Sequence, residues 1–446
     1  MEREWVNEGK LERVILVGVE TSDNHEDETD FERSMEELEN LAKACFMETI
    51  AVVTQKMEFI NKGLYIGTGK VAEVRELAEK LEADLIIFDN SLTPSQLRNL
   101  QSELGKPVMD RTNLILDIFE SRAKTREAKL QVETARLQYL LPRLVGMHEA
   151  LTRQGGTSGS MSSRGAGEKK LELDRRRIEH RLSELRKELD EVSDERMIQR
   201  KKRQSARIPL VALVGYTNAG KSTIMNAMVD KYVKDDDKKV LEKDMLFATL
   251  DTTVRRINTG NNKDFLLSDT VGFIHKLPHG LVKAFRSTLD EVKEADLLLV
   301  VVDYSDEHYK TQIQVVKDTI KGLEASDREI LYVFNKVDKA DNELAQKAQN
   351  EPVIREDAIY MSAHKEEHVR ALIDFVLQKV YGEYVQVTFL FPYDKSNLVH
   401  VLKENAQDVT MEYLPEGTRV TALCGKKEIR NRQHCCLFLI WYRFCG

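Results

Sequence analysis

Long apolar runs are missing from this chain of 446 residues. No stretch reaches the roughly 18 apolar residues that a membrane-spanning helix needs, and residues 1–10 are charged rather than forming a signal pattern. Hydrophobic residues still make up 41% of the sequence, which is enough for buried cores. We therefore expect a globular cytoplasmic protein of about three domains, with no membrane span.

Cysteine is also scarce. The chain has five cysteines, and four of them lie between Cys424 and Cys445, where Cys435 and Cys436 are adjacent. This arrangement has no zinc-site spacing and indicates no disulfide framework. A reducing compartment fits such a composition.

The strongest motif in the sequence is a loop bounded by two glycines. Residues 215–222 read Gly-Tyr-Thr-Asn-Ala-Gly-Lys-Ser and follow the apolar run 208–214. In this pattern the glycines allow backbone N–H groups to surround phosphate oxygens, Lys221 reaches the β and γ phosphates, and the Ser222 hydroxyl can bind Mg²⁺. The motif predicts a nucleoside triphosphate site.

Two later motifs select the base. Asn335-Lys-Val-Asp338 follows an apolar strand, and the Asp338 carboxylate can accept hydrogen bonds from N1 and N2 of guanine, a pair of donors that adenine lacks. Ser362-Ala-His364 resembles the loop whose backbone N–H meets the guanine O6. The predicted substrate is therefore GTP, with GDP as the bound product.

Two more stretches suit the metal and the γ-phosphate. Asp269-Thr-Val-Gly272 ends a predicted strand, so Asp269 can hold Mg²⁺ through water and the Gly272 N–H can sense the γ-phosphate. Within residues 247–251, Thr249 is the candidate that closes over Mg²⁺ in the triphosphate state. The predicted catalytic residues are Lys221, Ser222, Thr249 and Gly272, and the predicted metal ligands are Ser222 and Thr249. The predicted nucleotide-binding residues are Gly215, Tyr216, Thr217, Asn218, Ala219, Gly220, Lys221, Ser222, Phe247, Ala248, Thr249, Leu250, Asp251, Asp269, Thr270, Val271, Gly272, Asn335, Lys336, Val337, Asp338, Ser362, Ala363 and His364.

One position departs from the Ras-like pattern. Phe273 stands where Ras and Gα carry the glutamine that orients the attacking water, and a phenylalanine has no polar group for that task. We expect slow intrinsic hydrolysis, assisted by a partner or by a cation near Asn218. The asparagine in the phosphate loop resembles that of potassium-assisted GTPases, which implies K⁺.

The regions before this domain have their own patterns. Strand-like and helical runs alternate over residues 1–112, which predicts a small α/β domain. Its Gly63–Lys70 turn lacks phosphate-loop spacing, so we favour a structural turn there. Over residues 113–207, heptad and three-four spacings predict two long helices in an antiparallel hairpin. The segment 154–167 between them has five glycines and little to bury, which predicts a flexible tip.

The hairpin differs from the rest of the chain in charge. Residues 120–153 hold seven Lys/Arg against four Asp/Glu, and residues 164–207 hold fifteen against ten, within a chain of net charge −8. One interpretation is a solvated coiled-coil surface. The other is a projecting arm that enters a polyanionic cleft, and RNA in a structured particle then suits it better than free nucleic acid.

The remaining sequence completes the architecture. Residues 208–382 predict a doubly wound GTPase domain with its nucleotide at the carboxyl ends of the strands. A helix near 283–294 is placed to respond to the γ-phosphate. Residues 383–446 are predicted to form a small C-terminal α/β domain.

This arrangement resembles the HflX family of ribosome-associated GTPases across most of the chain. The matching stretches are 65–70, 110–119, 138–143, 165–168, 215–222, 247–251 and 269–274. The resemblance implies a monomer that hydrolyses GTP with Mg²⁺, acts on the large ribosomal subunit and helps to split stalled ribosomes under stress. Two departures stand out. Residues 250–253 read Leu-Asp-Thr-Thr rather than Leu-Asp-Pro-Thr, and the end from Cys424 to Gly446 is unlike the family's and could be a core strand, a partner surface or a divergent reading of the gene.

Two rival functions remain open from the sequence. The chain could be a GTP-gated scaffold whose hairpin grips a protein coiled coil. Alternatively, the Gly63–Lys70 turn could bind ATP and drive RNA remodelling. Co-sedimentation with ribosomal subunits tests the first, and ATP binding by residues 1–200 tests the second.

Overall fold

The computed structural model describes residues 11–21, 28–154, 161–205, 208–232, 253–259, 263–274, 291–382, 384–395, 399–400, 402 and 407–425. Its chain divides into two compact units, one built mainly from residues 1–201 and the other mainly from residues 202–446. Across these described ranges, no helix has both the length and the apolar character needed to cross a membrane. Cys45 is buried and forms no disulfide with another described residue.

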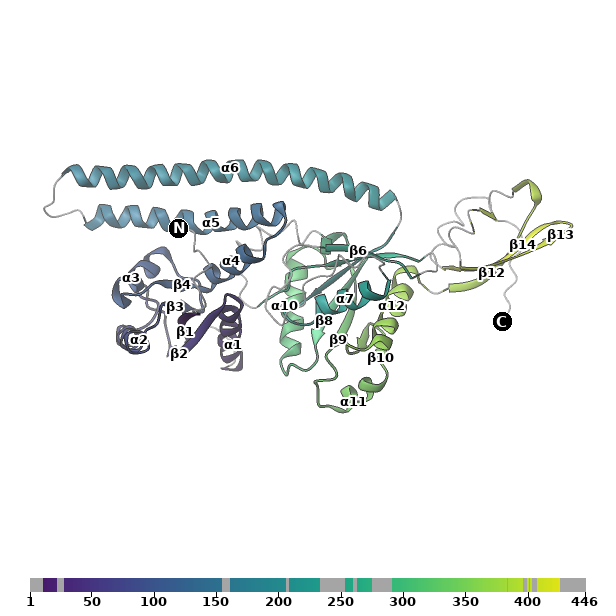
Figure 1. The fold of residues 1–446 in the computed structure, drawn as a ribbon, viewed down its shortest axis with the longest axis horizontal. Coiled ribbons are helices and arrows are strands. Elements are labelled where there is room, and N and C mark those ends of the chain that lie inside the picture. The colour runs from purple at the N-terminus through teal and green to yellow at the C-terminus, as the bar shows by residue number, and fades with distance from the viewer. Residues whose placement is uncertain are drawn as a thin grey trace. The chain divides into compact units, whose positions relative to one another are not determined.

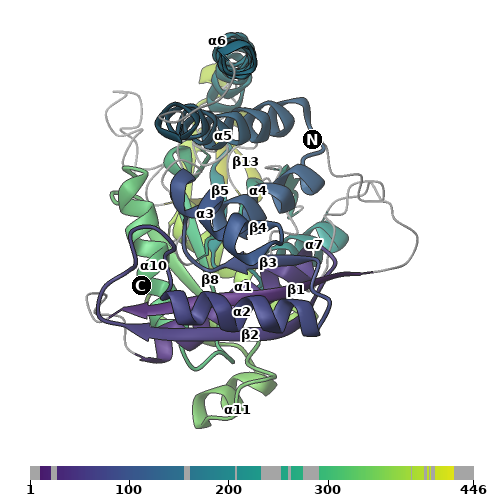
Figure 2. The same ribbon diagram turned by 90° about the vertical axis from the view of Figure 1, so that its left-hand side faces the viewer.

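The first unit contains the predicted small α/β domain (Figures 1 and 2). Its strands are β1 (Glu12–Thr21), β2 (Met47–Met57), β3 (Leu85–Phe88) and β4 (Val108–Asp110), which form a parallel sheet in the order β2-β1-β3-β4. Its helices are α1 (Glu28–Ala44), α2 (Thr68–Lys80), α3 (Pro94–Leu104) and α4 (Arg111–Arg122). Side chains of α2 and α3 share a core with Ile15 and Val17 of β1. Gly18, the next residue along β1 after Val17, lies against Phe31 and Met35 of α1. Successive β1 side chains face opposite sides of the sheet, so the helices cover both faces.

The first long helix predicted for the hairpin is two helices in the structure. α4 ends at Arg122, and α5 (Arg126–Gln154) begins after a short break. Ala123 has an extended backbone, and the Thr125 hydroxyl accepts a hydrogen bond from the Ala128 N–H at 3.1 Å, which caps the new helix. The predicted continuous helix is wrong here, because the heptad spacing carried on across this cap. The boundary predicted at residue 112 falls inside α4, which contacts α1, β4 and α5.

α5 lies antiparallel to α6 (Met161–Ser205), as Figures 1 and 2 show. Ion pairs join the two helices from Glu127 to Arg196 and from Glu133 to Arg181. The later residue of α5 therefore pairs with the earlier residue of α6, as an antiparallel arrangement requires. The prediction of a flexible tip over residues 154–167 is wrong for residues 161–167, which are helical and begin α6. Residues 155–160 of that tip lie outside the described ranges.

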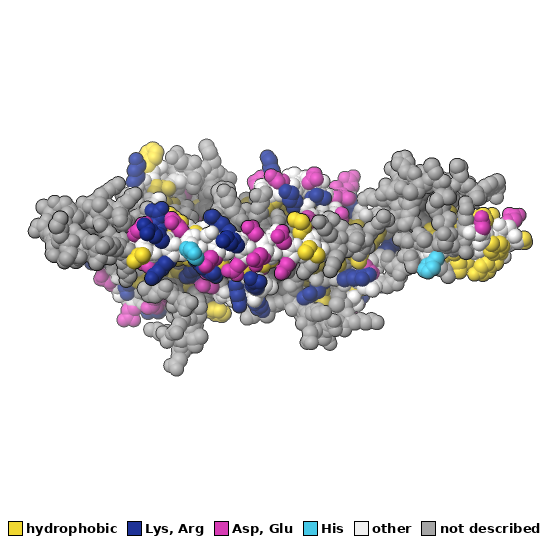
Figure 3. Space-filling model, turned by 90° about the horizontal axis from the view of Figure 1, so that it is seen from above, with side chains coloured by type: hydrophobic (Ala, Val, Ile, Leu, Met, Phe, Trp, Pro, Cys, Tyr) yellow, Lys and Arg dark blue, Asp and Glu magenta, His cyan; other side chains and the backbone are white. Residues whose placement is uncertain are grey.

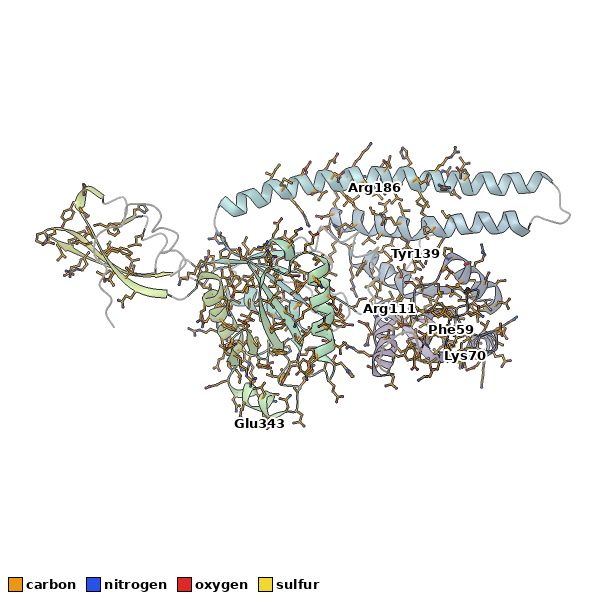
Figure 4. The ribbon with its side chains drawn as sticks, turned by 180° about the vertical axis from the view of Figure 1, so that it is seen from behind. Phe59, Lys70, Arg111, Tyr139, Arg186 and Glu343 are labelled. Carbon is orange, nitrogen blue, oxygen red and sulfur yellow. The ribbon has the colours of Figure 1, made fainter. Side chains whose placement is uncertain are left out.

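A cluster of polar side chains, which includes Tyr139 (labelled in Figure 4), fastens α5 to the N-terminal domain. The buried Asp110 carboxylate accepts hydrogen bonds from the Tyr139 hydroxyl at 2.8 Å and from Arg143 at 3.1 Å. Arg143 also donates to the Leu92 carbonyl at 3.0 Å. Burial, and then the Asp110 charge, raise the pKa of Tyr139 above its usual range, so the phenol stays protonated as a donor. Two of the stretches that resemble the HflX family, 110–119 and 138–143, thus meet in one structural contact.

The second unit contains a seven-stranded sheet in the order β10-β11-β9-β8-β5-β7-β6, which confirms the predicted parallel-sheet GTPase fold. Its strands are β5 (Leu210–Gly215), β6 (Thr253–Ile257), β7 (Phe265–Asp269), β8 (Leu297–Asp303), β9 (Glu329–Asn335), β10 (Val353–Arg355) and β11 (Ala358–Tyr360). Strands β6 and β10 pair antiparallel at the two edges, and the inner pairs are parallel. The described helices include α7 (Lys221–Tyr232), α10 (Tyr309–Gly322), α11 (Glu343–Asn350) and α12 (Glu366–Tyr381). Parallel strands place their carboxyl ends at one edge, and the predicted site residues gather there.

The C-terminal part has an antiparallel sheet of β12 (Tyr384–Phe391), β14 (Gly417–Gly425) and β13 (Gln407–Leu414), in that order. Val387, Phe391, Val420 and Ala422 form its small core. Residues 426–446 lie outside the described ranges, as does most of the helix predicted near 283–294, of which the structure describes only residues 291–294.

Candidate functional site

The predicted phosphate loop connects β5 to α7 through a strained turn. Gly215 and Gly220 have φ values of 153° and 98°, which L side chains rarely adopt. A Cβ on Gly215 would lie 2.3 Å from the Val301 carbonyl oxygen, and one on Gly220 would lie 2.2 Å from Asn335 Nδ2. Asn218 takes a left-handed conformation at φ 61°. The glycines of the motif are therefore required by close packing as well as by backbone conformation.

Lys221 begins α7 and is held inside the loop. Its side chain is 7% exposed, and Nζ donates to the carbonyl oxygens of Gly215 at 3.0 Å and Tyr216 at 2.7 Å. Burial lowers the pKa of Lys221 to about 8, while the nearby Asp269 carboxylate acts in the opposite direction. The ammonium form still predominates at neutral pH, so this position offers a cation in a largely water-excluded setting.

Ser222 and Asp269 bring two oxygen groups together. Asp269 ends β7, which lies beside β5, and its Oδ2 accepts a hydrogen bond from Ser222 Oγ at 3.2 Å. The next residue, Thr270, donates its hydroxyl to the Leu213 carbonyl at 2.6 Å. Hydroxyl and carboxylate oxygens are the ligands that Mg²⁺ prefers, so the donor set fits the predicted ion.

Gly272 and Phe273 lie directly against the phosphate loop. A Cβ on Gly272 would be 2.7 Å from Thr217 Cγ2 and 3.0 Å from Lys221 Nζ. The Phe273 N–H donates to the Gly215 carbonyl at 3.0 Å, and its carbonyl accepts from the Thr217 N–H at 2.8 Å. The Phe273 side chain is 2% exposed. It supplies no polar group, as the sequence indicated, but it has a structural role that the sequence did not reveal.

The base-selecting motifs converge on the same loop from two other strand ends. Asn335 Nδ2 donates to the Ala219 carbonyl at 3.1 Å, and its Oδ1 accepts from the Ala363 N–H at 3.0 Å. Lys336 donates to the Asn218 carbonyl at 2.8 Å. Asp338 and His364 are exposed, whereas Ser362 and Ala363 are buried. The structure thus brings residues 215–222, 269–273, 335–338 and 362–364 together.

Two residues that contact the site were not predicted from the sequence, and one predicted segment lies outside the described residues. Asp303 Oδ2 accepts a hydrogen bond from Lys336 Nζ at 2.7 Å, and its place at the carboxyl end of β8 is a signal that could have identified it. His368 accepts from the Ser362 N–H at 3.0 Å, and no motif marks it. Phe247–Asp251, including the predicted metal ligand Thr249, lies outside the described residues.

Comparisons with known proteins agree with this geometry. Three family models match in succession: "GTP-binding GTPase N-terminal" over residues 32–120, "GTP-binding GTPase Middle Region" over residues 122–203 and "50S ribosome-binding GTPase" over residues 210–336. A GTPase HflX of Caldanaerobacter subterraneus subsp. tengcongensis is 42% identical over 425 residues, which cover 94% of this chain and 93% of the relative. The GTPase HflX of Alkalihalophilus pseudofirmus is 44% identical over 408 residues, 92% of each chain.

A solved GTP-binding protein from Sulfolobus solfataricus, in complex with GDP, is 24% identical to this chain with a TM-score of 0.43. The match covers 83% of this chain and 99% of that protein. The sequence relatives carry the assignment, because their identity extends over nearly the whole chain. This chain belongs to the HflX family of GTPases and is a GTP hydrolase.

Proposed function

We propose that this GTPase acts in the cytoplasm as a monomer on the large ribosomal subunit and splits stalled ribosomes under stress. The observation that carries the proposal is the joining of a GTPase domain to a long antiparallel hairpin of net positive charge in a chain that is otherwise acidic. The family model matched by residues 210–336 is described as a 50S ribosome-binding GTPase, which supports the same partner.

The surface of α6 is suited to phosphate contacts that can be exchanged. Arg175, Arg176 and Arg177 each form an ion pair with a carboxylate on the same helix, and their side chains are 47%, 71% and 79% exposed. Figure 3 shows basic and acidic side chains interspersed along this helix. Exposed ion pairs contribute about 0–1 kcal/mol, so these guanidinium groups can leave their carboxylates for RNA phosphates at little cost.

We propose the nucleotide roles from the sequence motifs and, for the residues that the structure describes, from the site geometry. We assign the phosphates to the 215–222 loop, the guanine base to Asn335, Asp338 and the 362–364 loop, and the Mg²⁺ ion to Ser222 and Thr249, with Asp269 acting through water. When bound, the ion would neutralise charge on the β and γ phosphates. Lys221 lies where its ammonium can stabilise the same charge, because burial keeps competing water away from it.

The chain's own residues leave the attacking water without a side-chain partner at position 273. The Gly272 N–H is placed beside the loop, but Phe273 presents only a buried hydrocarbon ring. We therefore propose that the ribosome, or K⁺ held near Asn218, raises a slow intrinsic rate. Asn218 is exposed, and its carbonyl accepts a hydrogen bond from Lys336, which fixes the backbone at this position.

Sedimentation in a sucrose gradient tests the partner. The protein loaded with a non-hydrolysable GTP analogue is expected to travel with large ribosomal subunits, and the GDP-loaded protein is expected to stay near the top. Lys221→Ala is the matched control for dependence on nucleotide. If the analogue-loaded protein stays off the subunits but retains a protein partner, the scaffold function replaces this one.

A further inference from the structure

The loop that contains Ser362, Ala363 and His364 is held by a histidine outside every motif. His368 is the third residue of α12, and its side chain is fully buried. Its Nδ1 accepts a hydrogen bond from the Ser362 N–H at 3.0 Å. The N-cap residue of this helix, Lys365, makes no side-chain capping bond. His368 therefore reaches back from the third helical position, as glutamate does in a capping box, but to a residue further upstream.

The two ends of this contact bear directly on the base-selecting residues. The Ala363 N–H donates to Asn335 Oδ1 at 3.0 Å, so consecutive N–H groups of the loop are held by His368 and by Asn335. Asn335 is itself tied to the phosphate loop through Ala219. The backbone of the loop is thus held by the His368 imidazole of α12 and by the Asn335 side-chain amide of β9.

Building on the guanine site proposed above, we propose that His368 is a positioning residue for guanine recognition, whose imidazole holds the Ser362–His364 loop in its binding conformation. An imidazole nitrogen accepts a hydrogen bond only when it is unprotonated, so the proton of neutral His368 belongs on Nε2. Removing the acceptor would leave a buried N–H without its partner and free the loop to move. Affinity for the base would fall, while the phosphate contacts would stay intact.

The surroundings favour the neutral form. Burial lowers the pKa of His368, and the Lys365 charge acts in the same direction. The main chain of Asn350 and the carboxylates of Glu367 and Asp338 act in the opposite direction. As pH falls through the lowered pKa, His368 takes up a proton and loses its acceptor. Guanine affinity should then fall in the same range of pH.

Binding measurements on the full chain test the proposal with three ligands: GDP, ADP and inorganic tripolyphosphate. His368→Phe keeps a ring but removes the acceptor, whereas His368→Asn places Oδ1 where Nδ1 stood and does not titrate. His308→Phe is the matched control, because His308 also stands at the start of a helix and makes no side-chain capping bond there. Thermal unfolding of each variant reports its folding.

His368→Phe is expected to weaken GDP binding about tenfold, the effect of one buried hydrogen bond. Tripolyphosphate binding and kcat at saturating GTP should be unchanged, so the loss appears in KM. His368→Asn and His308→Phe should bind GDP like the wild type. Unchanged GDP affinity in a folded His368→Phe protein, or equal losses for GDP and tripolyphosphate, would overturn the proposal.

The pH dependence of GDP binding tests the proposal even if His368→Phe does not fold. As the pH falls from neutrality through the lowered pKa of His368, the wild type should lose affinity for GDP and His368→Asn should lose less. Equal losses in both would overturn the role of His368. A wild type that does not prefer GDP to ADP would instead remove the guanine site on which the inference rests.

Discussion

The Phe273 N–H donates to the Gly215 carbonyl at 3.0 Å, and this bond joins the end of the predicted γ-phosphate sensor to the first residue of the phosphate loop. A return bond runs from the Thr217 N–H to the Phe273 carbonyl. Both bonds use main-chain atoms, so they are independent of the side chain at position 273. The side chain contributes by being buried, and its packing can be separated from the chemistry.

Phe273→Ala should therefore lower stability more than it lowers turnover. Truncating a buried phenylalanine costs about 3–5 kcal/mol, which urea unfolding would measure. Turnover per folded molecule should stay far above that of Lys221→Ala, which loses a cation beside the phosphates. Phe273→Leu is the control, since it retains most of the packing. If turnover collapses in a folded Phe273→Ala protein, the packing of this ring holds the switch itself.

Asp303→Ala should weaken GDP binding by releasing Lys336. The Asp303 carboxylate is largely buried, accepts from Lys336 Nζ at 2.7 Å and is oriented by the Ser305 hydroxyl at 2.6 Å. The loss of a charged hydrogen bond costs about 1.5–3 kcal/mol, or roughly one to two orders of magnitude in affinity. Asp318→Ala, at an exposed position of α10, is the control. Equal affinities for the two variants would show that Asn218 alone positions Lys336.

Lys221 should make stability depend on alkaline pH. Its native pKa of about 8 lies below the ordinary value of 10.5, so between these values the unfolded chain binds more protons than the native one. Stability contributed by this group therefore rises with pH across that interval, by about 3 kcal/mol in total. The free energy of unfolding should be measured for the nucleotide-free wild type and for Lys221→Met across this pH interval. The difference between the two proteins should change by this amount. A difference that is constant with pH would mean that Lys221 titrates normally.

The sequence could predict this site wherever the chemistry is local. The 215–222 motif specified its own turn, because Gly215, Gly220 and Lys221 are close together in the chain. Asp269 and Asn335 were found because each ends a buried apolar strand. His368 and Asp303 were missed because their roles depend on which strand ends and loops meet in space, and one-dimensional spacing does not contain that information.

The fold shows the same division. Alternating apolar segments were enough to predict a small α/β domain over residues 1–112 and a doubly wound sheet over residues 208–382, although the three-residue strand β4 was too short to stand out. The break between α4 and α5 was missed because the leucine spacing continues across the Thr125 cap. At the tip, helix α6 extends to Met161 despite the glycines at 165 and 167, because helix propensity is only a weak guide to where a helix begins.

We propose that the hairpin acts on the ribosome while the nucleotide site hydrolyses GTP independently of it. Replacing residues 155–160 with a two-residue turn leaves the nucleotide site intact, and Arg175→Gln is a control that removes one exposed charge from the stem. The decisive measurement is the rate at which 70S ribosomes separate into subunits with GTP, followed by light scattering, beside the intrinsic GTPase rate of the same preparations. We predict that the shortened tip abolishes splitting and leaves intrinsic hydrolysis unchanged. Splitting at the wild-type rate by the shortened protein would contradict the account.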